Sequence, residues 1–249
     1  MGKLTGKYAV VTGAGKGIGR GIVERFLEDD VAGVAILELD EALAQATAKE
    51  LDPSGERVLA VQCNVADQES VQAAFAIVEQ RFGRVDILVN NAGITRDAMF
   101  HKMTAQQAKQ VMDVHFYGTF HCCQAVIKGM REREYGKIVN VSSTSAFGNV
   151  GQANYTAAKC AIDGFTRTLA LESIRKNITV NSIAPGFIDT EMLRAVPPEI
   201  MEARIKATPA QRLAPPSALA AAVSFLASDD SCWVTGDTIL CCGGARMRD

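Results

Sequence analysis

The chain has 249 residues, of which 48% are hydrophobic and 22% charged, which is enough to bury a sizeable core in one α/β domain. Its formal net charge of −2, spread over mixed positive and negative residues, gives no indication of a nucleic-acid partner. The amino terminus lacks the apolar core of a signal peptide and no apolar stretch is long enough to span a bilayer, so we expect a cytoplasmic protein with a small-molecule substrate.

Short apolar runs predict buried β-strands at residues 8–12, 34–37, 58–61, 87–89, 138–141 and 179–183. Amphipathic stretches of helical length lie between them, at 19–29, 41–51, 68–82, 104–131 and 153–176. This alternation predicts an α/β fold of the Rossmann type, with a doubly wound parallel sheet. The irregular stretch that runs from Pro197-Pro198 to Pro215-Pro216 is interpreted as part of a substrate lid around 190–212, so the whole chain, 1–249, is predicted to be a single domain.

The segment TGAGKGIG, residues 12–19, joins the first predicted strand to the first helix. Glycines there let the backbone approach a phosphate, and the helix amino terminus supplies oriented N–H groups. The segment fits neither Gly-x-Gly-x-x-Gly nor the phosphate loop of nucleotide kinases, because Lys16 is followed by Gly17. Glu38 stands at the end of the second strand, where it can accept hydrogen bonds from an adenosine ribose. Together these features predict a dinucleotide site.

Two charges give opposite indications about the cofactor. The Glu38 carboxylate would repel a 2′-phosphate, whereas Lys16 would attract one. We favour NAD over NADP, because Glu38 would contact the ribose directly and no arginine follows it.

Tyr155 and Lys159 are four residues apart, so on a helix they lie on one face, downstream of the pair Ser142-Ser143. A lysine cation lowers the pKa of a neighbouring phenol from its ordinary value of about 10. The pair can therefore transfer a proton to or from a carbonyl oxygen, although the same spacing also occurs by chance on surface helices.

Seven cysteines are present, but no Cys-x-x-Cys occurs and there are only three histidines. Zinc-type ligand spacing is absent, so we expect no metal and interpret most cysteines as small core residues in a reducing compartment. The cysteines are Cys63, Cys122, Cys123, Cys160, Cys232, Cys241 and Cys242.

Five motifs stand in the order and spacing of the short-chain dehydrogenase/reductase family, which the sequence resembles over essentially its whole length. They are Thr12-Gly-x-x-x-Gly-x-Gly19, Asn90-Asn91-Ala92-Gly93, Ser142/Ser143, Tyr155-x-x-x-Lys159 and Pro185-Gly186-x-x-x-Thr190. The resemblance implies a nicotinamide-dependent oxidoreductase in which Tyr155 exchanges a proton with the substrate oxygen. Lys159 would lower the pKa of Tyr155 and hold the nicotinamide ribose, and a serine would hydrogen-bond the substrate oxygen.

The same resemblance implies a set of residues that line the cofactor. They are Gly13, Gly15, Lys16, Gly17, Ile18, Gly19, Glu38, Asn64, Val65, Asn90, Ala92, Gly93, Tyr155, Lys159, Pro185, Gly186, Ile188 and Thr190.

The sequence departs from the family pattern at several positions. His115 stands where the family usually has an asparagine that positions a water in a proton relay, so it either takes over that role or is a satisfied interior histidine. The usual spacing to Tyr155 selects Ser142 as the active serine, but alignment of the preceding strand selects Ser143, which we favour. Asn64 replaces an aspartate beside the adenine, and Cys242 replaces an acid near the last strand.

Three segments, residues 93–97, 100–104 and 151–154, resemble those of 3-oxoacyl carrier-protein reductases and acetoacetyl-CoA reductases, so we expect a 3-oxoacyl thioester as substrate. Glutamates among Arg131, Arg133 and Lys137 argue against docking of an acidic carrier protein. Similarity to bile-acid hydroxysteroid dehydrogenases makes a bulky alicyclic alcohol the alternative, and a cofactor-binding regulatory protein without turnover is a more distant one.

The resemblance also implies a homotetramer with the last strand at a subunit interface. Apolar lid residues are interpreted either as a substrate wall or as ordinary helix packing. They are Met192, Leu193, Val196, Ile200, Met201 and Ile205.

Overall fold

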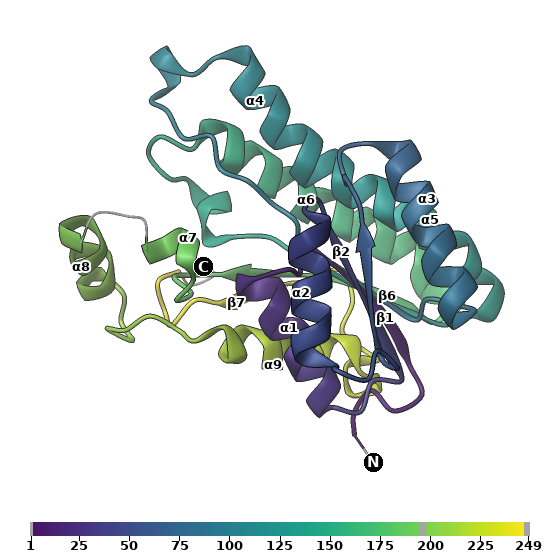
Figure 1. Ribbon diagram of the computed structural model, residues 1–249. Helices are drawn as coiled ribbons and strands as arrows, with labels where there is room; N and C mark the ends of the chain where they lie inside the picture. Colours follow the sequence, from purple (N-terminus) through teal and green to yellow (C-terminus); the bar gives the residue numbers. More distant parts are fainter. Residues whose placement is uncertain (1, 195–197, 247–249) are drawn as a thin grey trace.

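The apolar runs of the sequence form the strands of one parallel sheet, in which valine, isoleucine and leucine are buried against helices on both faces. The computed structural model describes residues 2–194 and 198–246 and is shown in Figure 1. The strands are β1 (Tyr8–Thr12), β2 (Gly33–Glu38), β3 (Val58–Gln62), β4 (Ile87–Asn90), β5 (Gly136–Val141), β6 (Ile178–Pro185) and β7 (Thr238–Cys241). The six strands predicted from the sequence are confirmed within a few residues.

The strand order is β3-β2-β1-β4-β5-β6-β7, and every neighbouring pair is parallel. Val10 on β1 pairs with Ala35 on one side and with Leu88 on the other, so the order reverses between β1 and β4. In such sheets a crevice opens at this reversal, beyond the carboxyl ends of the strands. The predicted Rossmann-type α/β fold is confirmed.

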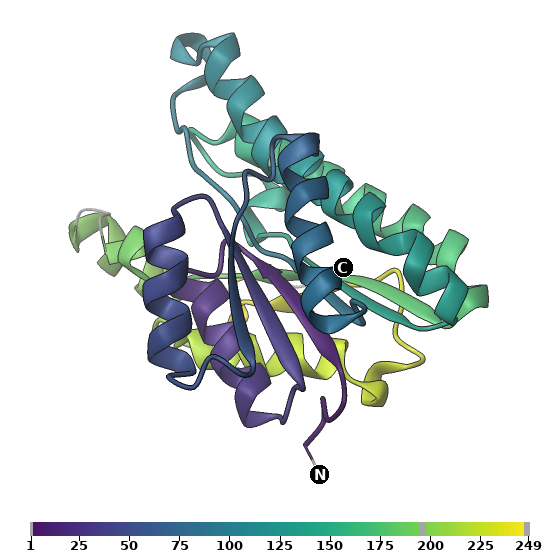
Figure 2. The same ribbon diagram turned by 45° about the vertical axis from the view of Figure 1, so that its right-hand side comes forward.

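Helices cover both faces of the sheet. They are α1 (Gly17–Glu28), α2 (Glu41–Leu51), α3 (Gln68–Phe82), α4 (Ala105–Met112), α5 (Gly118–Arg133), α6 (Ala153–Ser173), α7 (Glu191–Arg194), α8 (Pro198–Ala207) and α9 (Pro216–Ala227). One apolar cluster packs α1, α2 and α9 on the first face, with Phe26 fully buried, and a second packs α3 and α5 on the other. Figure 2 shows this layering from a second direction, with the purple α1 on one side of the sheet and the blue α3 on the other.

The predicted helix 104–131 differs from the structure in one respect that matters for the site. A π-helical turn, η2 (Asp113–Tyr117), separates α4 from α5 and carries His115. Such turns insert an extra residue into a helix and change the direction of its side chains, and they are frequent at functional sites. Hydrophobic periodicity does not reveal one extra residue, so the sequence predicted an uninterrupted helix.

The predicted lid contains α7 and α8, which lie together at the left of Figure 1. Its base is tied by the N–H of Asp189, which donates to the Ala214 carbonyl at 2.9 Å, and by the N–H of Ala214, which donates to the Phe187 carbonyl at 3.0 Å. Among the predicted wall residues, Leu193, Met201 and Ile205 are half-buried. Residues 195–197, Val196 among them, lie outside the described part of the chain, and so do the side chains of Met192 and Ile200.

Candidate active site

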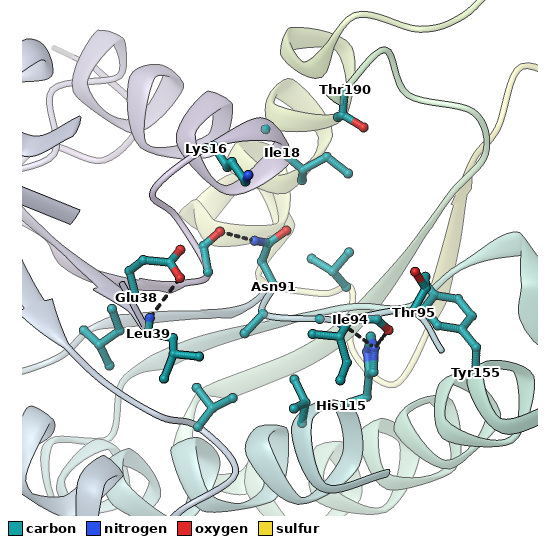
Figure 3. A pocket seen from close by; sticks show the side chains of 18 of the residues that line it. Lys16, Ile18, Glu38, Leu39, Asn91, Ile94, Thr95, His115, Tyr155 and Thr190 are labelled. Carbon is teal, nitrogen blue, oxygen red and sulfur yellow. Dashed lines mark hydrogen bonds between the residues drawn. The ribbon is translucent and has the colours of Figure 1, made fainter. Parts of the chain in front are cut away.

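A cleft of about 350 Å³ lies at the carboxyl ends of the central strands, where the strand order reverses. Its volume is in the range typical of small-molecule sites. Figure 3 shows Glu38 and Leu39 at one end of this cleft and Tyr155 at the other, with His115 beside it.

Most of the predicted site residues line this cleft. They are Gly13, Lys16, Gly17, Ile18, Glu38, Asn64, Val65, Ala92, Gly93, His115, Ser142, Tyr155, Lys159, Pro185 and Thr190.

The glycine turn between β1 and α1 has a backbone that only glycine accommodates. Gly13 and Gly17 have φ angles of 62° and 59°, in the left-handed region that side chains disfavour. A Cβ on Gly13 would lie 2.8 Å from the Cα of Ala92, and a Cβ on Gly19 would collide with the Gly13 carbonyl oxygen. The turn thus packs directly on the loop after β4, and the amino terminus of α1 opens onto the cleft. These residues fit the pyrophosphate of a dinucleotide.

Two residues without a predicted role hold this turn in place. The side-chain amide of Asn91 donates to the carbonyls of Thr12 and Gly13, both at 2.9 Å. In return, the hydroxyl of Thr12 accepts from the backbone N–H groups of Asn91 and Ala92, both at 3.0 Å. Asn91 belongs to the predicted motif Asn90-Asn91-Ala92-Gly93. The sequence indicated its role only in that a side-chain amide, which can donate two hydrogen bonds, follows the end of a strand.

Glu38 is fixed by the backbone at the ribose end of the cleft. Its carboxylate accepts from the N–H of Gly15 at 3.2 Å and from the N–H of Leu39 at 2.8 Å. Lys16 lies 3.5 Å from the carboxylate of Glu191 at the start of α7, and both side chains are mostly exposed. The lysine that was expected to attract a 2′-phosphate therefore has a carboxylate partner in the lid.

Lys159 is deeply buried at the other end of the cleft. Its ammonium donates to the Val141 carbonyl at 2.6 Å and lies 5.4 Å from the centre of the Tyr155 ring. Burial lowers the pKa of Lys159 to about 7, and the carboxylate of Asp163 opposes this shift.

The pKa of Tyr155 shifts in the direction opposite to the one expected from the sequence. Burial raises the pKa of Tyr155, the Ser143 hydroxyl opposes this by hydrogen bonding, and the Asp97 carboxylate adds to the rise. The expectation assumed a fully charged lysine alongside the phenol. The structure corrects it, because burial of the phenol itself is the largest influence on its pKa.

The two serines after β5 have different surroundings. Ser143 is not among the residues that line the cleft, but it stands close enough to Tyr155 to lower the pKa of the phenol by hydrogen bonding, and its hydroxyl accepts from the N–H of Ser145 at 3.0 Å. Ser142 lines the cleft, but its hydroxyl is buried and has no hydrogen-bond partner in the described part of the chain. The geometry thus favours Ser143 for contact with a substrate oxygen held by Tyr155.

His115 joins the loop after β4 to the tyrosine. Its Nε2 atom lies 3.0 Å from the backbone N–H nitrogen and 2.8 Å from the carbonyl oxygen of Ile94, as the dashed lines in Figure 3 show. The imidazole stands edge-on to the Tyr155 ring, with the ring centres 5.0 Å apart. Burial and, to a smaller extent, the nearby Lys159 together lower the pKa of His115 to about 3, so the ring is neutral at physiological pH. Its Nδ1 atom is buried and has no partner in the described residues.

Some predicted cofactor residues support the cleft from behind instead of lining it. Asn90 was expected to contact the cofactor, but its side chain is buried and donates to the amide oxygen of Asn140 at 2.8 Å. A Cβ on Gly186 would lie 2.9 Å from the Cα of Cys242, so close packing against Cys242 accounts for the glycine at this position. Gly15, Gly19 and Ile188 likewise stand outside the set of lining residues, and the sequence motif could not separate the two kinds of position.

Several residues that line the cleft had no predicted role. They are mostly apolar, and no chemical pattern in the sequence marked them: Leu37, Leu39, Cys63, Asn91, Ile94, Thr95, Val114, Val141 and Glu191.

The cysteines give no sign of a shared function. All seven are free; Cys63, Cys122, Cys123 and Cys242 are buried, whereas Cys160 and Cys232 are exposed. Within residues 2–194 and 198–246 no group of three acidic, histidine or cysteine side chains could hold a metal ion. None of the helices described is long and apolar enough to cross a membrane.

Comparison with known proteins relates the chain to a family of reductases. Residues 13–246 match the family model described as enoyl-(acyl carrier protein) reductase. The chain is 41% identical over 245 residues to the 3-oxoacyl-(acyl-carrier-protein) reductase of Vibrio cholerae, covering 98% of this chain and 99% of that protein. It is 42% identical over 245 residues to the acetoacetyl-CoA reductase of Shinella zoogloeoides, covering 96% and 98%. It is also 40% identical over 243 residues to the short-chain reductase NovJ of Streptomyces niveus, covering 95% and 92%.

These alignments extend over nearly the full length of each relative, and the site motifs lie within them. The family predicted from the sequence is thereby confirmed. The chain belongs to the short-chain dehydrogenase/reductase family of nicotinamide-dependent oxidoreductases.

Proposed function

We propose that the chain interconverts a 3-oxoacyl thioester and its 3-hydroxy form by hydride transfer. The observation that carries this proposal is that Tyr155 and Lys159 line one end of a cleft, with Ser143 beside Tyr155, while the glycine turn and Glu38 line the other end. The names of two relatives, a 3-oxoacyl-(acyl-carrier-protein) reductase and an acetoacetyl-CoA reductase, support this substrate class.

The nicotinamide cofactor supplies the hydride that reduces the carbonyl carbon. As the carbonyl electrons move onto oxygen, Tyr155 donates its phenolic proton to that oxygen, and Ser143 stabilises the developing charge with a hydrogen bond. Lys159 in its charged form stabilises the phenolate that remains. In the oxidation direction Tyr155 accepts the proton from the alcohol instead.

NAD is the cofactor that the ribose end of the cleft suits better. The Glu38 carboxylate, held by two backbone N–H groups, would repel a 2′-phosphate, and Lys16 is paired with Glu191. NADP remains the alternative, because the Lys16 pair is exposed and exposed pairs contribute little.

His115 positions the loop that follows β4. The Nε2 atom of a neutral imidazole can either accept from the Ile94 N–H or donate to the Ile94 carbonyl. The Nδ1 atom carries the ring proton in the first case and lacks it in the second. The bond to Ile94 thus supports a structural role for His115, since Nδ1 is buried and has no partner in the described residues through which a proton relay could run.

A coenzyme A thioester fits the surface better than a thioester on an acidic carrier protein. The basic residues at the end of α5 and after α6 make hydrogen bonds within the chain: Arg131 donates to the Glu172 carbonyl at 2.8 Å, Arg133 to the Val85 carbonyl at 2.6 Å, and Lys176 to the Glu134 carboxylate at 2.7 Å. Of these, only Lys176 is paired with an acid among the described residues, but Glu132 and Glu134 stand between the basic residues, so this surface offers no purely basic patch to an acidic carrier protein.

The chain is further proposed to be one domain that works as a homotetramer in the cytoplasm. Leu171 and Trp233 leave 79% and 94% of their surfaces exposed, which supports burial against other subunits. Light scattering of the purified protein tests the oligomeric state, and a monomeric mass would contradict it.

Initial rates with NADH and NADPH against acetoacetyl-CoA and a 3-ketosteroid test the function. We expect acetoacetyl-CoA turnover, faster with NADH. Turnover of the steroid alone would make the alicyclic alcohol the substrate class. Tight cofactor binding without turnover of either ketone would support a regulatory protein and reject the proposed activity.

A further inference from the structure

Lys159 is a charged group in a nearly dry site. It is only 3% exposed, and its ammonium donates to a neutral carbonyl, that of Val141, with no carboxylate of the described residues bonded to it. A charged lysine in such surroundings loses much of its hydration and tends to release its proton. The reaction nevertheless needs the cation, so another group must supply the missing stabilisation.

Asp163 stands one helical turn after Lys159 on α6, so the two side chains lie on the same face of the helix. Its carboxylate accepts a hydrogen bond from the Ser182 hydroxyl on β6 at 2.9 Å, and Ser182 is in turn 2.7 Å from the Thr238 hydroxyl on β7. Ser182 and Thr238 are both buried, so the chain of hydroxyl groups fixes the acid between α6 and the sheet.

The other titratable groups that bear on Lys159 carry no charge near neutral pH. Tyr155, on the same helix, has a raised pKa, and His115, on the π-helical turn, has a pKa of about 3. Asp163 is the group whose charge favours protonated Lys159.

We propose that Asp163 is a positioning residue that keeps Lys159 protonated during turnover, and that Ser182 and Thr238 hold the acid in place for this purpose. The inference rests on the proposed roles of Tyr155 and Lys159. No motif marked Asp163 in the sequence, because its effect depends on the burial of Lys159 and on contacts from β6 and β7.

The test compares Asp163→Asn with the wild type, because an asparagine keeps the acceptor for Ser182 and removes the charge. Turnover is measured from about pH 6 to 9, using acetoacetyl-CoA or whichever ketone the wild type reduces. We expect the alkaline limb of the rate profile to move to lower pH, with about a tenfold loss near pH 8.5 and less than about a twofold loss near pH 6. Asp163→Glu should restore much of the profile, and Ser182→Ala should shift it in the same direction by less.

Glu172→Gln is the matched control, since it removes one acid from an exposed position on the same helix, about 20 Å along the axis from Lys159. An equal loss for Asp163→Asn at every pH, or the same shift for Glu172→Gln, would overturn the proposal.

Thermal unfolding of the cofactor-free protein gives a readout that does not need activity. The attraction between Asp163 and Lys159 stabilises the folded protein only while Lys159 is charged, that is, below its pKa of about 7. The melting temperature of Asp163→Asn should therefore fall further below that of the wild type at pH 6 than at pH 9. A deficit independent of pH would refute the inference about Asp163, whereas inactivity of the wild type on every ketone would reject only the proposed function.

Discussion

Replacing Gly93 with alanine tests the packing between the loop after β4 and His115. The Gly93 backbone lies outside the left-handed region, so the cost of a side chain there is steric. A Cβ would lie 2.5 Å from Cε1 of His115 and 3.2 Å from Nδ1. The imidazole is buried and hydrogen-bonded to Ile94, so it cannot move without losing that bond.

Overpacking of this kind costs about 1–3 kcal/mol, and the lost hydrogen bond adds about 1 kcal/mol. We therefore expect Gly93→Ala to lower the free energy of unfolding by about 2–4 kcal/mol, and the melting temperature by about 5–15 °C for a chain of this size. Because the ring also packs edge-on against Tyr155, turnover should fall too.

A double-mutant cycle with His115→Ala separates this clash from other effects. Removing the ring makes room for the new methyl group, so the double mutant should be more stable than the sum of the single changes predicts, by about 1–3 kcal/mol. Gly164→Ala is the control, since its Cβ would meet only the end of the Arg167 side chain at 3.8 Å, and it should not destabilise the protein. If calorimetry found Gly93→Ala within about 1 °C of the wild type, or the two changes additive, the described packing would be wrong.

Three further predictions concern the two ends of the cleft. Ser143→Ala should lower kcat by about 100-fold. Ser142→Ala removes a hydroxyl without a partner in the described residues and should change kcat by less than about threefold. Equal mild effects of the two variants in steady-state assays would contradict a catalytic serine. Glu38→Gln should raise the ratio of kcat/KM for NADPH over NADH by about tenfold, and an unchanged ratio would remove Glu38 as the basis of NAD preference. The folded-state pKa of Lys159, about 7, lies below its unfolded value, so its stability penalty is full below pH 7 and declines as the pH rises toward the unfolded value. Lys159→Met should therefore raise the melting temperature more at pH 6 than at pH 9.5, and a gain independent of pH would show that Lys159 is not desolvated.

Much of the fold was predictable from the sequence, because strands buried on both faces are continuous apolar runs and the helices between them are amphipathic. The runs at β1, β2 and β4 correctly located the strands and therefore the crevice at their ends. The π-helical turn around His115 was not predictable, since one extra residue leaves the surrounding hydrophobic pattern nearly unchanged.

The functional site was likewise predictable only in part. Tyr155, Lys159 and the glycine turn were recognisable because their chemistry requires particular residue types at fixed spacing. Burial was not recognisable, and it reverses the expected pKa shift of Tyr155 and lowers the pKa of Lys159. The inward turn of Asn90 and the role of Asn91 at the glycine turn depend on contacts between distant segments, which a motif does not specify.

The most direct test of the central claim is the single-turnover rate of Tyr155→Phe with saturating cofactor and acetoacetyl-CoA. The variant retains the ring that packs on His115 and loses only the phenolic hydroxyl group. We predict hydride transfer at least about 1,000-fold slower than in the wild type, with cofactor affinity within about twofold. A rate close to that of the wild type would show that Tyr155 is not the proton donor and would contradict the account of the site.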